Sequence, residues 1–379
     1  MWRGLPKSIC IFQEISAWKK ISCCGLCKMK KPELYDSNGY VNIKGILETG
    51  CPFIFIWGGR GTGKTYGILK YAVENNKKFI YLRTRQTQID MIRTPQFNPF
   101  KQYNTDCNRR ITPSPINKMY SGFYDTSFDE KTKKYTNTGE PLGYSAALGT
   151  ISNLRGFGAA DVELMFYDEF IPEKTEPQLK NATIALLNGY ETINRNRELM
   201  GDKPLQLICA SNSENANCDI FTKLGLIRKV TDMHKTGQEF SYLPDRGIIL
   251  INLANSPISQ AKSETAVYRM VGKDSDFYKM SIQNDFYAED YSDIKSEPIN
   301  EYVPIVTVGE ITIYTHKSKE KLYITQHLQG SPQIKYSTST RDLTAFRHKF
   351  IWVWGMYLDG LVSFSDIESK YLLDNYFKM

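Results

Sequence analysis

The chain is 379 residues long, which is more than a single hydrophobic core usually organises, so two or three domains are expected. Hydrophobic residues make up 41% and charged residues 23% of the chain, and these values exclude collagen-like, low-complexity and wholly disordered proteins. No apolar stretch approaches the ~18 residues of a membrane span and no signal peptide follows the basic start, so we expect a cytoplasmic protein. The net charge of +7 permits a polyanionic partner without requiring one.

The eight cysteines are too thinly scattered in a chain of this length to predict a disulfide framework, which fits a reducing compartment. The cluster Cys23, Cys24 and Cys27 contains one Cys-x-x-Cys, but no second pair or His lies nearby to complete four zinc ligands. We therefore predict reduced thiols and no zinc site.

The chain opens with a basic segment, residues 1–45, which has no clean hydrophobic period and contains a turn at Gly39. We interpret it as an N-terminal extension. Its lysines predict a solvated arm, and the alternatives are a contact with a phosphate backbone or a strap onto a neighbouring subunit.

Residues 46–226 have the pattern of an α/β domain, in which short apolar runs alternate with helical stretches. This order is typical of strands joined by crossover helices in a parallel sheet. A polar, proline-punctuated stretch, Thr94–Pro141, interrupts the pattern and predicts loops with a hairpin. The expected core elements are a strand at Phe53–Trp57, a helix at Lys64–Asn75, and strands at Phe79–Leu82, Val162–Tyr167 and Leu205–Ala210.

The last two segments differ in pattern from the α/β domain. Residues 227–297 are interpreted as a linker segment with helical character, and residues 298–379 as a small α+β domain. In that domain, alternating residues predict strands at Val303–Tyr314 and Lys321–Thr325. The aromatic stretch Arg347–Leu358 favours a core strand over a base-stacking surface.

A complete phosphate-loop motif, G-x-x-x-x-G-K-T, follows the first predicted strand and opens the predicted helix, which is the context that this motif requires. Its glycines let successive backbone N–H groups point at phosphate oxygens, and the start of the helix adds the positive end of its dipole. Lys64 is expected to reach the β and γ phosphates, and Thr65 to bind Mg²⁺ through its hydroxyl. The predicted nucleotide-binding residues are Gly58, Gly59, Arg60, Gly61, Thr62, Gly63, Lys64 and Thr65.

Two carboxylates, Asp168 and Glu169, follow the predicted strand Val162–Tyr167. Ligands of open α/β sheets bind at such strand ends. Asp168 is therefore expected to join the Mg²⁺ shell, and Glu169 to act as the base that activates water for attack on the γ phosphorus. The Asp-x-x-Gly of small GTPases is missing, and Asn117-Lys118 lacks the aspartate that guanine recognition needs, so ATP is favoured.

One asparagine and three arginines complete the predicted catalytic set. Asn212 comes just after the strand Leu205–Ala210 and is expected to sense the γ phosphate or the attacking water, with a simple Asx turn as the alternative. Oligomeric ATPases commonly need an arginine from a neighbouring subunit to neutralise transition-state charge. Arg195 and Arg197 lie between the two motif strands and Arg155 precedes the first. A surface salt bridge is the alternative for each arginine.

The order of these motifs resembles that of phage genome-packaging ATPases of the large-terminase type, and most closely that of the encapsidation ATPase of small protein-primed tailed phages. The resemblance covers Ile54–Asn212 well and the remainder only in layout. It rests on the phosphate loop and on Asp168-Glu169-Phe170, Arg155-Gly156 and Arg195-Asn196-Arg197.

The resemblance implies a P-loop ATPase of the ASCE type that forms a homomeric ring, with five subunits expected, on the portal of a preformed capsid in the host cytoplasm. Using ATP with Mg²⁺, the ring would drive double-stranded DNA into the capsid. A packaging RNA is an open further partner. By the same resemblance Arg195 and Arg197 are the first candidates for the arginine that acts in trans, and Arg155 is their rival. The alternatives are another oligomeric DNA translocase or helicase, and a nucleotide-dependent scaffolding module with little turnover.

Large terminases also carry a C-terminal nuclease of the ribonuclease H type, whose chemistry needs clustered carboxylates that hold two metal ions. Glu310, Asp359 and Asp366 lie on or near the predicted strands, but the first long strand lacks the central aspartate of such a site. Residues 298–379 therefore resemble a degenerate nuclease fold, and nuclease activity is not expected.

A translocase should contact mainly DNA phosphates, because it must move over any sequence. Basic residues of the inserted stretch are the candidates for this contact, with a solvated loop surface as the alternative. They are Arg109, Arg110, Lys131, Lys133 and Lys134.

Overall fold

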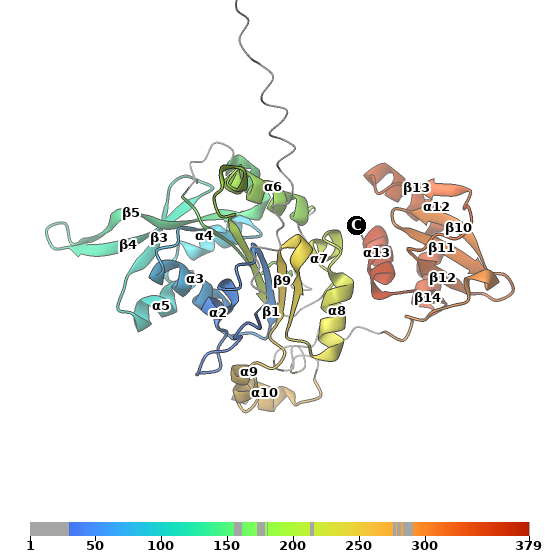
Figure 1. Cartoon of the computed structure of the whole chain (residues 1–379), viewed down its shortest axis with the longest axis horizontal. Helices are drawn as coiled ribbons and strands as arrows, with labels where there is room; N and C mark the ends of the chain where they lie inside the picture. Colours follow the sequence, from blue (N-terminus) through green and yellow to red (C-terminus); the bar gives the residue numbers. More distant parts are fainter. Residues whose placement is uncertain are drawn as a thin grey trace, which may run out of the picture.

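The computed structural model describes residues 30–154, 161–172, 179, 181–212, 216–275, 278, 282 and 291–378. Within these ranges the chain forms one nine-stranded sheet and a separate five-stranded sheet, each accompanied by helices (Figure 1). The prediction of a mixed α/β protein with a large, mainly parallel central sheet is confirmed.

The centre of the large sheet contains the strands that the sequence predicts. Here β1 pairs with β7, β7 with β6, and β6 with β2, all in parallel, so their carboxyl ends meet at one edge of the sheet. Nearly all of their residues are buried, which explains why they are continuous apolar runs rather than alternating ones. These strands are β1 (Phe53–Gly58), β2 (Phe79–Arg83), β6 (Leu164–Asp168) and β7 (Gln206–Asn212).

The inserted stretch extends this sheet by three strands, in the order β3-β4-β5-β2-β6-β7-β1-β9-β8, where β8 is Phe240–Leu243 and β9 is Ile248–Asn252. The predicted hairpin is present as β4 and β5, but the stretch is a continuation of the sheet rather than a set of loops, because the second half of β5 pairs in parallel with β2. The tip of the hairpin projects well away from the body of the domain (Figure 1). The added strands are β3 (Ile111–Pro115), β4 (Ser121–Asp129) and β5 (Lys134–Ala147).

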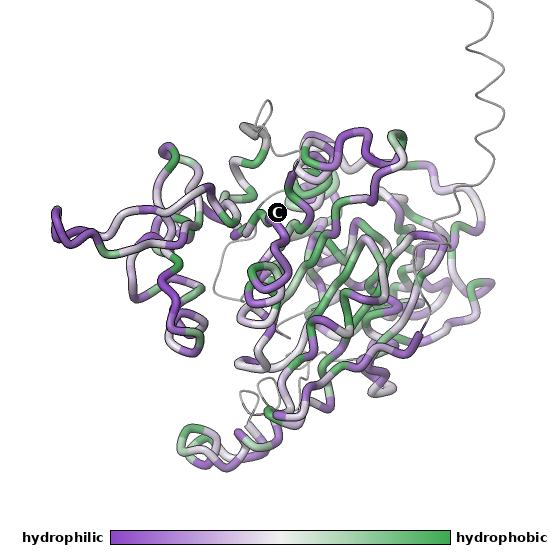
Figure 2. Tube along the Cα trace, turned by 60° about the vertical axis from the view of Figure 1, so that its left-hand side comes forward, coloured by the Kyte–Doolittle hydropathy of each residue, from purple (hydrophilic) through white to green (hydrophobic). Residues whose placement is uncertain are grey.

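Helices cover both faces of the large sheet, because alternate residues of a strand point to opposite sides. On β1, Ile54 and Ile56 belong to one hydrophobic core, and Phe55 and Trp57 to the other. Figure 2 shows the apolar strands running through the interior, with polar segments outside them. The first core is covered by α2 (Ile43–Leu47), α3 (Lys64–Glu74), α4 (Gln86–Ile92) and α5 (Lys101–Asp106), and the second by α6 (Ala182–Asn194), α7 (Asp219–Lys223) and α8 (Ile227–Thr236).

The α/β domain extends beyond the predicted range 46–226. Val41, in the predicted N-terminal extension, is part of its core. The predicted linker, 227–297, supplies α8 and two further strands, β8 (Phe240–Leu243) and β9 (Ile248–Asn252). Because β9 is parallel to β1 and entirely buried, the interpretation of its segment as a linker is wrong. After β9 the predicted helical character is present as α9 (Pro257–Lys262) and α10 (Ala266–Val271).

The C-terminal domain contains the five-stranded sheet, and two of its predicted elements need correction. The predicted strand Val303–Tyr314 is a hairpin, because the chain turns at Gly309 with a φ of 53°. The stretch Arg347–Leu358 is helical, since Phe346, Phe350 and Val353 recur at helical spacing and face the core. In sheet order the strands are β13 (Ile334–Tyr336), β10 (Tyr302–Val308), β11 (Ile311–His316), β12 (Leu322–Thr325) and β14 (Val362–Phe364), and the helices are α12 (Thr340–Leu358) and α13 (Ile367–Lys378).

Helix α13 connects the C-terminal domain to the α/β domain. Its Ile367 and Tyr371 pack into the core that α7 and α8 cover, whereas Leu373 packs into the core of the five-stranded sheet. Asn375 Nδ2 donates a hydrogen bond to Asn217 Oδ1 at 3.3 Å. The two domains therefore share an apolar contact in addition to the chain that joins them (Figure 1).

Within the described ranges no helix combines the length and the apolar character that a membrane span needs. Cys107, Cys209 and Cys218 are free thiols. Cys51 is disulfide-bonded, whereas the prediction of reduced thiols concerns Cys23, Cys24 and Cys27. The cysteine cluster at residues 23–27, where no zinc site is expected, lies outside the described residues.

The place of β9 in the core can be tested with Leu250, whose side chain is fully buried. Leu250→Ala should lower the free energy of unfolding by about 2 to 5 kcal/mol, because it leaves a cavity beside β1. Met270→Ala in α10, where the side chain is 79% exposed, should change it by less than about 0.5 kcal/mol. Urea unfolding followed by circular dichroism measures both, and equally small effects would contradict the position of β9.

Candidate functional site

The phosphate loop joins β1 to α3 at the carboxyl edge of the large sheet. Gly61 and Gly63 have φ angles of 70° and 90°, in the left-handed region that other residues adopt only at a cost. A Cβ added to Gly58 would lie 2.5 Å from the Cβ of Leu253. The glycines of the motif are therefore required by this backbone path, and the path leads into the first turn of α3, where unpaired N–H groups favour an anion.

Lys64 lies beneath the loop with its ammonium group buried. Its Nζ donates to the carbonyl oxygens of Gly58 at 3.0 Å and Gly59 at 2.9 Å, and to the hydroxyl of Thr62 at 3.2 Å. Burial lowers the pKa of Lys64 to about 7, although the nearby carboxylate of Asp168 partly offsets this effect. An anion placed in the loop would restore the charged form of this lysine.

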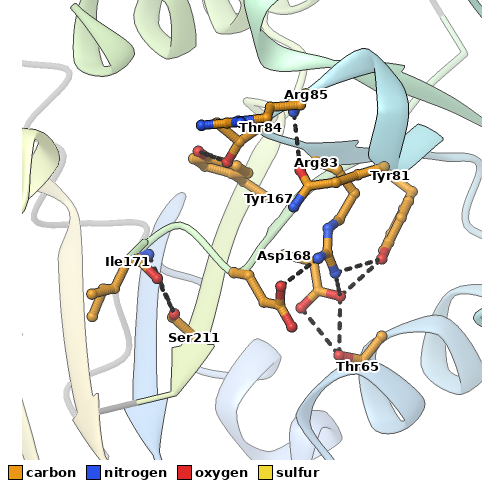
Figure 3. A network of polar contacts seen from close by, with 11 residues as sticks. Thr65, Tyr81, Arg83, Thr84, Arg85, Tyr167, Asp168, Ile171 and Ser211 are labelled. Atoms are coloured by element: carbon orange, nitrogen blue, oxygen red, sulfur yellow. Dashed lines mark hydrogen bonds and ion pairs between the residues drawn. The ribbon is translucent and has the colours of Figure 1, made fainter. Parts of the chain in front are cut away.

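Asp168 ends β6 and is the most densely contacted carboxylate of the site (Figure 3). The Thr65 hydroxyl approaches its two oxygens at 3.1 and 3.2 Å, the Tyr81 hydroxyl donates to it at 2.9 Å, and Arg83 Nη1 does so at 3.4 Å. Thr65 comes from α3, and Tyr81 and Arg83 come from β2. Asp168 therefore ties the phosphate loop to two neighbouring strands.

Glu169 follows Asp168 with a φ of 55°, an uncommon backbone conformation for a residue other than glycine. Its backbone N–H donates to the Ala210 carbonyl at 2.7 Å, which continues the pairing with β7. The side chain is 43% exposed, against 8% for that of Asp168, and its carboxylate forms an ion pair with Arg83 Nη2. The two adjacent carboxylates thus have different environments, one enclosed and the other open to solvent.

Arg83 and Tyr81 are the residues of this network that sequence reasoning missed. Burial disfavours the charged form of Arg83, yet Tyr81, Asp168 and Glu169 together hold its pKa above the usual value. The two residues lie at the end of β2, which pairs directly with β6. The sequence does contain a relevant signal, because the polar residues at the end of a strand that neighbours β6 must lie beside Asp168. Identifying that neighbouring strand requires the order of strands in the sheet.

Asn212 lies at the end of β7, at the same edge of the sheet. Its Oδ1 accepts a hydrogen bond from Lys64 Nζ at 3.5 Å, so the predicted sensor residue is within reach of the phosphate loop. The preceding Ser211 holds the chain after β6 instead, because its hydroxyl exchanges hydrogen bonds of 3.2 Å with the backbone of Ile171 (Figure 3).

The predicted trans arginines lie apart from this cluster. Arg195 and Arg197 follow α6, the 13-residue helix that runs from the carboxyl edge of the sheet back to the start of β7. A helix of that length spans about 20 Å, so both arginines lie at the edge opposite the phosphate loop of their own subunit. Arg155, the rival candidate, is outside the described residues.

The predicted DNA contacts divide into two groups. Arg109 forms an ion pair with Asp125, and the guanidinium of Arg110 stacks 3.4 Å from the centre of the Tyr135 ring, so both have partners within the β3–β4–β5 extension. The remaining candidates are exposed at the tip of the projecting hairpin: Lys131, Lys133 and Lys134. Arg110 is also exposed, whereas Arg109 is partly buried.

The C-terminal carboxylates are distributed over three elements. Glu310 lies at the turn of the β10–β11 hairpin, Asp359 caps the end of α12, and Asp366 precedes α13. Glu368, which the sequence analysis did not name, has a raised pKa because of burial and because Asp366 and Glu310 are nearby. Among the residues that the structure describes, no group of three or more His, Cys, Asp or Glu is placed to hold a metal ion.

The donor set at the phosphate loop fits a magnesium nucleotide. Thr65 and Asp168 supply a hydroxyl and a carboxylate oxygen 3.1 Å apart, and oxygen ligands of this kind are those that Mg²⁺ binds. Lys64 and the glycine-rich backbone face the same edge and supply the positive side of an anion site. The site therefore combines a glycine-rich loop that fits phosphate, a hydroxyl and a carboxylate that fit a metal ion, and the more exposed carboxylate of Glu169.

Comparison with known proteins gives a family and a fold. The model of a family described as Podovirus DNA encapsidation protein (Gp16) matches residues 35–352, and the search of curated proteins finds no match. One similar solved structure is the Phi-28 gp11 DNA packaging motor, which is 20% identical in sequence, covers 90% of this chain and 98% of its own, and has a TM-score of 0.60. Another is the bacteriophage Phi-29 viral genome packaging motor assembly, which is 18% identical, covers 89% of this chain and 98% of its own, and also has a TM-score of 0.60.

The lowered pKa of Lys64 predicts how nucleotide affinity depends on pH. Bound phosphates favour the charged form of Lys64, whose pKa without nucleotide is about 7. At a pH above this pKa, Lys64 must take up a proton when ATP binds, whereas at a lower pH it already carries that proton. The dissociation constant for ATP should therefore rise by up to about tenfold per pH unit between about pH 7.5 and 9. Calorimetric titration measures it, and Lys64→Arg, which stays charged, should give a flatter profile. A flat profile for the unaltered protein would contradict this assignment.

Proposed function

The chain belongs to the Podovirus DNA encapsidation protein (Gp16) family, and we propose that the site at the phosphate loop is the ATPase centre that drives its packaging of DNA. ATP-driven DNA packaging is accordingly its function. The observation that carries the assignment of the site is the contact between Thr65 of α3 and Asp168 of β6. It joins a phosphate cradle to a metal-binding carboxylate, which is the arrangement that phosphoryl transfer requires.

Each residue of the centre has a separate task in this proposal. The loop backbone and Lys64 hold the β and γ phosphates of ATP, while Thr65 and Asp168 hold Mg²⁺. The metal ion, when bound, neutralises charge that develops on the phosphate oxygens. Asn212, which already contacts Lys64 at 3.5 Å, orients the γ phosphate or the attacking water.

Glu169 is the proposed general base, because its carboxylate is the more exposed of the adjacent pair and can accept a proton from water. Its ion pair with Arg83 orients this carboxylate and also competes for its lone pairs. A carboxylate has two oxygens with about four lone-pair sites, so Glu169 can keep this ion pair and still accept a proton from water.

A homomeric ring is proposed from the position of the arginines. Arg195 and Arg197 lie at the edge of the sheet opposite the nucleotide edge, so neither can complete the site of its own subunit without a large rearrangement. Head-to-tail packing of identical subunits would bring this edge against the nucleotide edge of a neighbour. We expect five subunits, with Arg155 as the alternative source of the finger.

The remaining partners follow from the same proposal. The ring acts on the portal of a preformed capsid in the host cytoplasm, a packaging RNA can join it, and double-stranded DNA passes through its centre. Lys131, Lys133 and Lys134 at the hairpin tip are proposed to contact DNA phosphates, together with Arg109 and Arg110, which contact β4 and β5 of the same extension. We propose that residues 298–379 are a degenerate nuclease-like domain whose role is attachment rather than cutting.

Glu169→Gln should retain ATP binding and lower the rate of hydrolysis at least about 100-fold, because an amide cannot accept the proton of the attacking water. Glu163→Gln is the matched control, since Glu163 lies just before the same strand and pairs with Lys77 near the opposite edge of the sheet. Phosphate release measures turnover, and equilibrium titration measures binding. Normal turnover of Glu169→Gln would remove the assigned base.

Mixed rings test whether the arginines act between subunits. Rings made only of an arginine variant (Arg195→Ala or Arg197→Ala) should be inactive, and so should rings made only of Lys64→Ala. A mixture of an arginine variant with Lys64→Ala should recover turnover, because some sites then combine the intact loop of an arginine variant with the intact arginine of a Lys64→Ala neighbour. Random mixing would form about a quarter of the sites in this way. If neither arginine variant recovers activity when mixed, the arginines act within their own subunit or not at all.

Stimulation of turnover by DNA distinguishes the motor from the rival classes. Double-stranded DNA with empty capsids should raise ATP hydrolysis above that of isolated subunits. Stimulation by single strands alone would favour a helicase, and no stimulation by either would favour a scaffolding module.

A further inference from the structure

A lysine outside every recognised motif lies on the phosphate loop. Lys262, the last residue of α9, donates a hydrogen bond from Nζ to the Arg60 carbonyl at 2.8 Å. A Cβ added to Gly61 would collide with the same ammonium group. The side chain therefore contacts the backbone at the middle of the loop, although Lys262 and Arg60 are 202 residues apart in the chain.

The segment that carries this lysine follows the loop along its length. It begins at Leu253, whose N–H donates to the Trp57 carbonyl at 2.9 Å and whose side chain fills the space beside Gly58. It then turns into α9, where Ser256 and Ser259 are buried and Lys262 ends the helix. The chain between β9 and α10 is thus anchored to the phosphate loop at both ends.

The charge of Lys262 acts on the same place as that of Lys64. Lys262 is one of the groups whose positive charge opposes protonation of Lys64, and burial lowers its own pKa. Two ammonium groups held near one another are unfavourable unless an anion lies between or beside them. The positive charge above the loop is therefore suited to the negative charge of a polyphosphate.

We propose that Lys262 binds the phosphates of the nucleotide in its own subunit and thereby couples occupancy of the site to α9 and to the chain that leads to the C-terminal domain. The inference rests on the proposed ATPase centre and adds to it a phosphate-binding residue from the segment after β9. An ammonium group has three N–H donors, and the bond to Arg60 uses one of them. Phosphate oxygens are the acceptors that the other two fit.

Affinity measurements on the full chain test the contact. Lys262→Ala should weaken ATP binding about tenfold, the loss expected for one charge-assisted hydrogen bond, whereas Lys262→Arg should stay within about threefold. Lys70→Ala is the control, because Lys70 lies on the exposed side of α3 and pairs with Glu74, and it should bind ATP normally. An unchanged dissociation constant for Lys262→Ala, with Lys64→Ala still defective, would overturn the inference and leave the ATPase assignment intact. If the unaltered protein fails to bind ATP, the proposed function itself fails.

Hydrogen exchange distinguishes two roles of Lys262: binding of nucleotide phosphates, and a purely structural contact with the Arg60 carbonyl. Saturating ATP should slow amide exchange in residues 257–271 of the unaltered protein. In Lys262→Ala at saturating ATP, exchange should slow in the phosphate loop but not in residues 257–271. A purely structural contact predicts instead that Lys262→Ala speeds exchange in the phosphate loop and in residues 257–271 before nucleotide is added. It also predicts that ATP does not slow exchange in residues 257–271 of the unaltered protein. That result would overturn the proposal.

Discussion

The buried carboxylate of Asp168 is the constraint on which the rest of the site depends. A charged group that is removed from water must be compensated by hydrogen bonds and opposite charge. Asp168 is compensated by Thr65 of α3 and by Tyr81 and Arg83 of β2. One side chain therefore fixes the first turn of the phosphate-loop helix against two strands of the sheet. Because the strands are parallel, their ends supply these partners at a single edge.

The parallel strands also give the large sheet two chemically different edges. The carboxyl edge contains the phosphate loop, the two carboxylates and Asn212, whereas α6 carries Arg195 to the other edge. A subunit with a nucleotide edge and an arginine edge is suited to head-to-tail assembly. Helix α13 contacts α7 and α8 of the α/β domain and α9 contacts the phosphate loop, and we propose both contacts as links between the ATPase centre and the C-terminal domain.

Local patterns in the sequence were sufficient to predict the positions of the motif residues, but they were insufficient to predict which other residues contact them. The strand that ends at Gly58, the helix that begins at Lys64 and the carboxylates at the end of β6 are where the motif spacing predicts them, because each depends on neighbouring residues. Arg83 was missed because its role depends on the pairing of β2 with β6, which are far apart in the chain. β9 was missed for the same reason. The helix at Arg347–Leu358 was missed because its aromatic residues favour strands by propensity, while helical packing on the five-stranded sheet decides the outcome.

The most direct test of the account is a structure of the chain with a non-hydrolysable ATP analogue and Mg²⁺. The account predicts the metal ion bound to Thr65 and Asp168, the γ phosphate within hydrogen-bond distance of Lys64, and the carboxylate of Glu169 turned toward a water molecule in line with the γ phosphorus. An analogue bound elsewhere, or a metal ion held without Asp168, would contradict it.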